Sequence, residues 1–488
     1  MRKILIGSIL TAASLHAAAT PWVGTLDPQL HNDLVTLSEY RALDSVVNTY
    51  PVPWKGIANQ LSHLDESQYP EHVRLAVHRL RHYLRLEQMH DIDSYVEIYG
   101  ASDPSRFTAF NGEQRPSARL TNTTEFTSGR WSAQLSVNLE PGGERNLDQS
   151  YIAMQVADWT LSLSAMDQWW GPAHSNSLIL TDNARPVPSI GISRATTQAS
   201  KSKWLSWLGS WYFTAQLGQL ESERTVPDIK LWRTRFTFSP VKGLELGAAW
   251  SAMWGGGGQP NGFSDFIDIL TFQEVCSNGA ATCDPALNTK LGNHIAGFDL
   301  KYNFNLGDTP VSIYAQRVGE DAVDTYRVTD NANAFGISTY LVGAKVYFET
   351  SDTNIDCAND GSNRTNCYYE SSTYPDGYRH YQRAIGSTFD SDAKHFTFGG
   401  YYHPNSRDLI GWQLSRIELN PDGERPSPVM TESVEEELWY VSGYYQTAWR
   451  DWQIKIGGNV AQREFNLEQR DNKTDYNIYL HLRYALTE

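Results

Sequence analysis

The sequence predicts a mainly β fold, a large antiparallel outer-membrane β-barrel of about 18 strands with a small periplasmic α-helical bundle at its N-terminus. Three observations predict this fold. The chain begins with an export signal, many segments alternate between apolar and polar residues, and these segments often begin or end with an aromatic residue. Together they are typical of a barrel that crosses a membrane with strands and carries aromatic girdles at both interfaces.

Residues 1–19 have the features of a secretory signal peptide. Arg2 and Lys3 precede an apolar run, and the small residues Ala17 and Ala19 form a cleavage signal after it. The apolar run is too short for a membrane-spanning helix. We therefore exclude this segment from the fold and expect an exported protein that is cleaved after Ala19.

Residues 20–93 show helical rather than strand patterns. Asp27 can cap a helix whose first residue is Pro28, and a shorter helix is expected from Trp54. A third helix is expected from Pro70, because four apolar residues follow at helical spacing: Val73, Val77, Leu80 and Leu84. A domain this small gains little stability from its own core. We therefore expect it to dock at the periplasmic mouth of the barrel.

Residues 94–488 contain the strand patterns. In "YNIYLHLRYAL" (476–486) alternate residues are apolar, and the residues between them are mostly polar. The same alternation occurs in "WSAQLSVNLE" (131–140) and "FDLKYNFNL" (298–306). A soluble β-sandwich also alternates. The number of segments, their length and the strongly polar second face favour a wide barrel with a wet or plugged lumen.

The four cysteines form two local pairs in small, polar, loop-like intervals. In the sequence, Cys276 and Cys283 bracket one short interval, and Cys357 and Cys367 bracket another. In an exported chain these pairs indicate two loop disulfides, although four cysteines permit three connectivities. Neither pair has the spacing of a metal site, so we expect no metal.

Net charge and motif content exclude several classes of function. The formal net charge of −16 argues against nucleic acid as a partner. The sequence contains no serine elbow, HExxH motif or Walker loop. We therefore expect no enzymatic activity and no cofactor. An acidic glycan is not excluded, because its recognition depends on local arginines and aromatic faces.

The segment "DQWWGPAHSNSLILTDNARPVPSIGISR" (167–194) closely resembles the signature of the Wzi family of outer-membrane capsule-assembly proteins. The resemblance continues through "VPDIKLWRTRFTFSPVKGLELG" (226–247) and "DGYRHYQRAIG" (376–386), and covers essentially the whole mature chain. It implies a lectin-like, non-catalytic anchor that holds capsular polysaccharide or exopolysaccharide at the cell surface.

Two other functions stay open at this point. One is a porin or sugar-uptake channel, and the other is a barrel enzyme that modifies glycan or lipid. A transmembrane barrel also implies contact with outer-membrane lipids and lipopolysaccharide, and with the barrel-assembly machinery during insertion. We expect a monomer.

The candidate carbohydrate-binding residues are aromatic side chains and one arginine: Trp169, Trp170, Arg185, Tyr368, Tyr369, Tyr374 and Tyr378. The tryptophan pair and Arg185 lie in a segment that glycine and proline make irregular. We favour a packing role for this segment, because adjacent tryptophans are costly to expose. Sugar contact is then assigned to the loop tyrosines, whose flat faces suit sugar C–H surfaces.

Overall fold

The structure is a computed structural model that describes residues 20–23, 27–89, 91–110, 112–271, 292–323, 327–355, 357–358, 363–364, 367–371, 373–424, 434–466 and 471–486. The signal peptide predicted at residues 1–19 therefore lies outside the described residues, as do Cys276 and Cys283. None of the described helices is long and apolar enough to span a bilayer.

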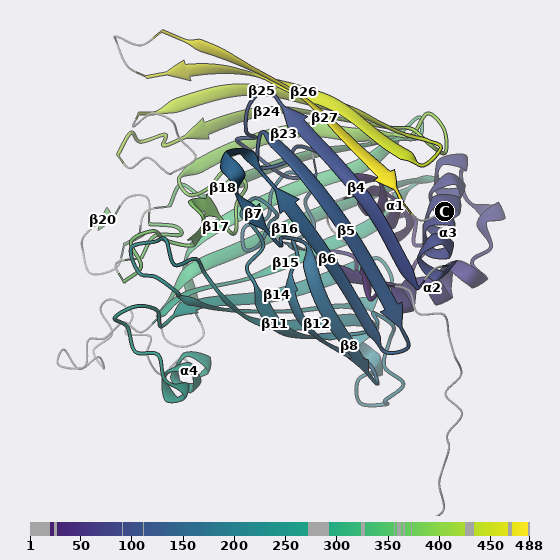
Figure 1. The fold of residues 1–488 in the computed structure, drawn as a ribbon, viewed down its shortest axis with the longest axis horizontal. Coiled ribbons are helices and arrows are strands. Elements are labelled where there is room, and N and C mark those ends of the chain that lie inside the picture. Colours follow the sequence, from purple (N-terminus) through teal and green to yellow (C-terminus); the bar gives the residue numbers. More distant parts are fainter. Residues whose placement is uncertain are drawn as a thin grey trace, which may run out of the picture.

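A closed antiparallel barrel makes up most of the chain, and β27 pairs with β4 to close it (Figure 1). The wall strands are β4 (Ile92–Ala101), β5 (Ala118–Ser128), β6 (Trp131–Leu139), β7 (Arg145–Asn146), β8 (Ser150–Val156), β9 (Trp159–Ala165), β11 (Ser189–Arg194), β12 (Ser210–Gln219), β13 (Lys230–Val241), β14 (Leu244–Trp254), β15 (Gly292–Leu306), β16 (Thr309–Val323), β17 (Arg327–Leu341), β18 (Ala344–Asp352), β23 (Ala393–Tyr402), β24 (Leu409–Leu419), β25 (Glu436–Trp449), β26 (Trp452–Phe465) and β27 (Lys473–Ala485). Because β7 and β8 both pair with β6 as two parts of one strand, the described wall has 18 strands. The predicted fold class is confirmed.

The remaining elements lie at the two ends of the barrel or inside it. The helices are α1 (Pro28–Glu39), α2 (Trp54–His63), α3 (Glu71–Met89) and α4 (Phe263–Leu270), with short 3₁₀ turns η1 (Glu66–Gln68), η2 (Pro141–Gly143) and η3 (Ser206–Leu208). The short strands are β1 (Trp22–Val23), β2 (Thr49–Tyr50), β3 (Val52–Pro53), β10 (Trp169–Trp170), β19 (Cys357–Ala358), β20 (Asn363–Arg364), β21 (Arg379–His380) and β22 (Arg383–Ala384).

The two ends of the barrel differ in their connections. At the end where α1, α2 and α3 lie, here called the helix end, tight turns such as 129–130, 342–343 and 450–451 join the strands (Figure 1). At the opposite end, here called the loop end, long connections such as 255–291 and 353–392 join them, and α4 lies there. Short turns at one end and long loops at the other are typical of outer-membrane barrels.

The alternation seen in the sequence sorts residues between the two faces of the wall. In β27, the side chains of Tyr476 and Ile478 are 68% and 63% exposed on the outside of the barrel. The side chain of Tyr479, on the lumen side of the same strand, is 2% exposed. Large apolar residues of β6 and β15, such as Leu135 and Phe298, are also exposed on the outside. An exterior covered with apolar side chains requires a lipid environment.

The N-terminal helices form where the sequence predicts them. Asp27 accepts hydrogen bonds from the backbone of Gln29 at 2.8 Å and of Leu30 at 3.4 Å, which caps α1. The guanidinium of Arg79 on α3 pairs with the buried carboxylate of Asp33 on α1, with Nε–Oδ2 at 2.8 Å. The helices are therefore linked by a charged contact as well as by their apolar faces.

The N-terminal part does more than dock at the mouth of the barrel: it packs against segments inside the barrel and pairs with one of them. Its apolar core includes Phe110 and Trp169, which come from connections at the loop end. In addition, β2 pairs antiparallel with β10, so that Tyr50 faces Trp169 and Thr49 faces Trp170. Residues 20–93 therefore share their core with segments that lie inside the lumen.

Four segments fill the lumen, and we call them the plug: the described parts of 27–53, 102–117, 166–188 and 367–392. Side chains of the last three segments form buried clusters with inward-facing residues of the wall, and side chains of 27–53 pack against Phe110 and Trp169 of the other segments. A barrel of this width cannot be filled by its strand side chains alone, so the plug supplies the missing volume.

Candidate functional site: the plugged lumen and its outer surface

Inward-facing carboxylates of the wall hold the backbone of the plug. Glu349 on β18 accepts hydrogen bonds from the backbone N–H groups of His174 at 2.7 Å and Ser175 at 2.8 Å. Glu245 on β14 accepts from the backbone of Val47 at 3.1 Å and Asn48 at 3.0 Å. Each wall carboxylate thus satisfies two backbone donors that irregular plug segments leave without a secondary-structure partner.

A second pair of wall side chains fixes the segments that contain the candidate site residues. Gln316 on β16 accepts from the backbone of Leu178 at 2.8 Å and donates to the carbonyl of Trp170 at 3.0 Å. Glu320 accepts from the backbone of Tyr369 at 2.6 Å. The plug is therefore hydrogen-bonded to the wall at several levels along the barrel axis.

A buried charge cluster anchors α1 inside the helix end. The carboxylate of Glu39, 1% exposed, accepts from the ammonium groups of Lys301 and Lys345, both at 2.9 Å, and from the hydroxyl of Tyr340 at 2.6 Å. Burial alone would raise the pKa of Glu39, but the two ammonium groups and this hydroxyl hold the pKa well below its usual range. Glu39 is therefore a carboxylate that binds three wall strands at once, β15, β17 and β18.

Trp169 and Trp170 are both 1% exposed and pack inside the plug. The ring of Trp169 lies 4.8 Å from that of Phe110, and its Nε1 donates to the carbonyl of Ala173 at 3.1 Å. The backbone of Trp170 donates to the carbonyl of Leu180 at 3.0 Å. Neither ring presents a face to solvent, as expected if the two tryptophans pack the plug rather than contact sugar.

The four candidate tyrosines are also buried, which corrects their assignment to sugar contact. Tyr368, Tyr369 and Tyr374 are 0% exposed and Tyr378 is 1% exposed. Their hydroxyl groups donate to backbone carbonyls, those of Tyr368 and Tyr369 to Leu178, that of Tyr378 to Ile179 and that of Tyr374 to Gly255. Residues 367–378 belong to a connection that folds into the lumen, so the rings brace the plug from within.

Arg185 lies at the loop-end surface of the plug. Its guanidinium forms two hydrogen bonds with Asp148, at 2.9 and 3.0 Å, and lies 4.5 Å from the ring centroid of Tyr381. Tyr381 is 43% exposed, and Gln382 beside it is also exposed. Both residues have positive φ, 48° and 63°, because they form the tip of the β21–β22 hairpin.

Sequence reasoning missed Tyr381, although it lies in the quoted motif "DGYRHYQRAIG". The available signal was local: Tyr381 is the aromatic residue between the polar His380 and Gln382, where a two-residue hairpin tip would turn. Below this tip, His380 Nδ1 and the carboxylate of Glu221 are 2.5 Å apart. Burial lowers the pKa of His380, and Glu221 opposes that shift. This paired histidine fixes the hairpin to the 220–229 connection.

Cys357 and Cys367 lie in the connection between β18 and β23 at the loop end, whereas Cys276 and Cys283 lie outside the described residues. Cys367 is disulfide-bonded. Cys357 begins the short strand β19, and the pairing of these two cysteines stays a prediction, as does that of Cys276 with Cys283. In the described part of the chain, no group of three or more histidine, cysteine, aspartate or glutamate side chains is arranged to hold a metal ion.

A closed barrel with an apolar exterior and a filled lumen defines an outer-membrane β-barrel protein. The profile of the capsule assembly protein Wzi family matches residues 88–477, so the chain belongs to this family. By the same evidence the protein is located in the outer membrane.

Several relatives and structures are similar to the chain. The structure of Escherichia coli Wzi, described as an outer-membrane protein involved in group 1 capsule assembly and a carbohydrate-binding β-barrel, superposes with a TM-score of 0.79 at 24% identity, over 95% of this chain and 99% of that one. Pseudomonas aeruginosa OccK10 superposes with a TM-score of 0.44 at 10% identity, over 81% of this chain and 99% of that one.

A sequence relative from Klebsiella pneumoniae, described as an uncharacterized 55.8 kDa protein in the cps region, is 34% identical over 305 residues. The match covers 60% of this chain and 57% of that relative's length.

Proposed function

We propose that this protein holds capsular polysaccharide or exopolysaccharide at the outer face of the outer membrane, without catalysis. Membership of a capsule-assembly family supports this function, and so does the description of Escherichia coli Wzi as carbohydrate-binding. In this proposal the helix end faces the periplasm and the loop end faces the polysaccharide outside the cell.

The observation that carries the proposal is the bonded plug. A porin needs a water-filled lumen, whereas here Glu245, Gln316 and Glu349 attach plug backbone to the wall. Such a barrel is suited to presenting a fixed outer surface rather than to passing solutes. The porin alternative predicts large steady currents from the intact protein in planar bilayers, and such currents would overturn the anchor.

The surface that fits a sugar best is formed by Arg185 and Tyr381. The exposed tyrosine ring can stack on the C–H face of a pyranose, and the adjacent guanidinium can donate to hydroxyl or carboxylate groups. Each contact of this kind contributes about 0.5–1.5 kcal/mol. A polymer can bind many copies of the protein at once, so weak single sites suffice for strong retention.

The proposal also includes partners of the barrel wall. The apolar exterior contacts outer-membrane lipids and lipopolysaccharide, and the barrel-assembly machinery inserts the strands. We keep a monomer as the expected oligomeric state.

The test compares surface-bound with released polysaccharide in a deletion strain that carries variants, normalised to the amount of heat-modifiable, folded barrel. Tyr381→Ala and Arg185→Ala should each release part of the polymer, and the double variant should release most of it. Tyr402→Ala is the matched control, because Tyr402 is 41% exposed and ends β23 at the helix end.

Two outcomes would contradict the proposal. If the double variant retains all of the polysaccharide, Arg185 and Tyr381 are not part of the binding surface. A change in the chain length or chemistry of the polymer upon deletion would favour the barrel-enzyme alternative instead.

A further inference from the structure

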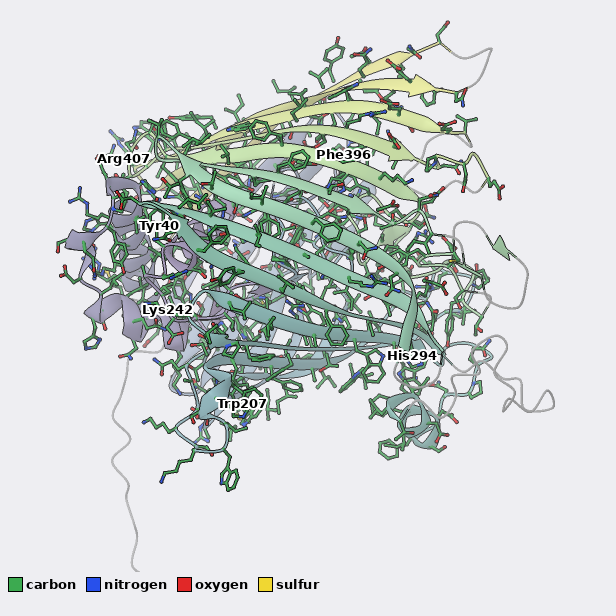
Figure 2. All side chains as sticks on the ribbon, turned by 180° about the vertical axis from the view of Figure 1, so that it is seen from behind. Tyr40, Trp207, Lys242, His294, Phe396 and Arg407 are labelled. Carbon is green, nitrogen blue, oxygen red and sulfur yellow. The ribbon has the colours of Figure 1, made fainter. Side chains whose placement is uncertain are left out.

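The connection between β11 and β12, residues 195–209, is the longest of the described connections at the helix end. Elsewhere at this end, tight turns such as 242–243 and 450–451 join neighbouring strands. Here the chain instead forms a compact excursion that contains the 3₁₀ turn η3. Figure 2 shows Trp207, in this excursion, projecting from the side of the barrel. The excursion therefore lies beside the wall, at the level of the helix end.

Ring contacts place the excursion on the outer surface of the wall. Thr237 of β13 is buried on the lumen side, so its neighbours Phe236 and Phe238 face outward. The ring centroid of Trp207 lies 6.1 Å from that of Phe238. The ring centroid of Trp211 on β12 lies 6.0 Å from that of Phe236. The excursion thus extends an aromatic surface that faces lipid.

Hydrogen bonds and close packing fix both ends of the excursion. At its start, the hydroxyl oxygens of Thr197 and Ser45 are 2.7 Å apart, and the carbonyl of Thr197 accepts from the backbone of Trp211 at 2.9 Å. At its end, Gly209 has a φ of 64°, and a side chain at this position would collide with the carbonyl of Ser239. The position of the excursion beside the wall is therefore set by the fold.

The tip of the excursion, residues 201–207, is exposed and partly apolar. Trp204, Leu205 and Trp207 are 87%, 42% and 63% exposed. Large apolar side chains gathered on one exposed segment mark a contact surface. Tryptophan is enriched at membrane interfaces, because its apolar ring and its N–H group suit the boundary between acyl chains and headgroups. A tip of this composition beside the wall matches the edge of a lipid leaflet.

The tip also carries positive charge that the chain does not balance. Lys201 and Lys203 are exposed, and within the described residues neither forms an ion pair. Asp158, whose carbonyl accepts from the backbone of Ala195 at 2.8 Å, pairs with Lys55 at 3.6 Å instead. The chain as a whole has a formal net charge of −16, so a basic tip is a local exception. Basic side chains next to interfacial tryptophans are complementary to anionic headgroups.

We propose that the 201–207 tip binds anionic phospholipid at the headgroup level of the leaflet next to the helix end. Trp204 and Trp207 lie at the boundary of headgroups and acyl chains, and the ammonium groups of Lys201 and Lys203 bind lipid phosphate. Assigning this leaflet to the periplasmic side rests on the orientation given in the proposed function. The lipid contact itself does not depend on polysaccharide.

The experiment measures tryptophan fluorescence of the full-length barrel in nanodiscs of one fixed composition, phosphatidylethanolamine with a minor fraction of phosphatidylglycerol. Brominated acyl chains are carried either by the phosphatidylglycerol or by the same amount of phosphatidylethanolamine. The signal of the tip is the difference between the unaltered protein and Trp204→Ser/Trp207→Ser. Brominated phosphatidylglycerol should quench this signal about twofold more strongly, or better, because the lysines enrich anionic lipid beside the tryptophans.

The double variant Lys201→Gln/Lys203→Gln should abolish this preference. Lys394→Gln/Lys473→Gln is the matched control and should keep it, because these two lysines lie at the loop end and each pairs with an aspartate. Raising the ionic strength from about 0.1 M to about 1 M should weaken the preference in the unaltered protein, because the screening length falls from about 10 Å to about 3 Å.

Heat-modifiable migration reports whether each variant folds, and the salt dependence tests the charge contact without any substitution. Equal quenching of the tip by the two labelled lipids would overturn the proposal, as would a preference that survives in folded Lys201→Gln/Lys203→Gln. Quenching by neither lipid would overturn it as well and would make a protein partner the occupant of the tip. Polysaccharide retention should be unchanged in Lys201→Gln/Lys203→Gln, so failure of the lipid contact and failure of the proposed anchoring surface can be told apart.

Discussion

Replacing Glu39 with glutamine tests whether the buried charge cluster holds α1 in the barrel. The substitution keeps the shape of the side chain but leaves the ammonium groups of Lys301 and Lys345, each 1% exposed, without their counterion. Removing one partner of a buried ion pair costs about 3–5 kcal/mol. The opening equilibrium of α1 should therefore rise by about a hundredfold to several thousandfold.

Hydrogen–deuterium exchange of residues 28–39 in the detergent-solubilised barrel measures this opening, and Glu71→Gln is the control because Glu71 is exposed on α3. Adding Lys345→Met to Glu39→Gln should restore part of the protection, since it removes one uncompensated charge. Protection should also fall as the pH drops below about 4.5, the usual pKa of a glutamate, because the folded state holds the pKa of Glu39 below that value. Exchange in Glu39→Gln within a few-fold of the unaltered protein would refute the reasoning.

Three further predictions concern the plug and the membrane interface. Trp170→Ala should leave a cavity that costs about 3–5 kcal/mol and lowers the folded fraction on gels; normal folding with loss of polysaccharide would instead assign sugar binding to this ring. Burial raises the pKa of Asp182 to about 7, so the free energy of unfolding should fall as pH rises from about 4 to 7. Asp182→Asn should flatten this pH dependence, and an unchanged slope in the variant would contradict the role of Asp182. Trp204 and Trp207, 87% and 63% exposed at the helix end, should be quenched by brominated lipid, and the double serine variant should lose that quenching; Figure 2 shows Trp207 pointing away from the barrel.

The wall could be predicted from the sequence because lipid and lumen impose opposite polarities on successive residues. In β27 this rule separates Ile478, on the lipid side, from Tyr479, on the lumen side, with no knowledge of the neighbouring strands. The rule is incomplete where a loop covers the exterior. Ala252 and Trp254 continue the outward face of β14, yet α4 buries them through Ile269, and no pattern in the sequence predicted that helix.

The plug could not be predicted, because its contacts join residues far apart in the chain. Glu349 bonds to His174 and Ser175, yet in the sequence it is one more polar residue on the lumen side of a strand. The loop tyrosines pose the same problem. Tyr369 and Tyr381 lie in the same long connection, but the described part of it buries Tyr369 in the lumen and leaves Tyr381 exposed at the tip of the β21–β22 hairpin.

The pairing of β2 with β10 has a consequence for the order of assembly. Residues 49–50 leave the export machinery before every wall strand, yet they end up enclosed by a ring that only the final strand, β27, completes against β4. We therefore expect residues 49–50 to be placed while the ring is still open. After the seam closes, the β2–β10 pairing lies inside a complete ring, so water and other chains reach it only from the ends of the barrel.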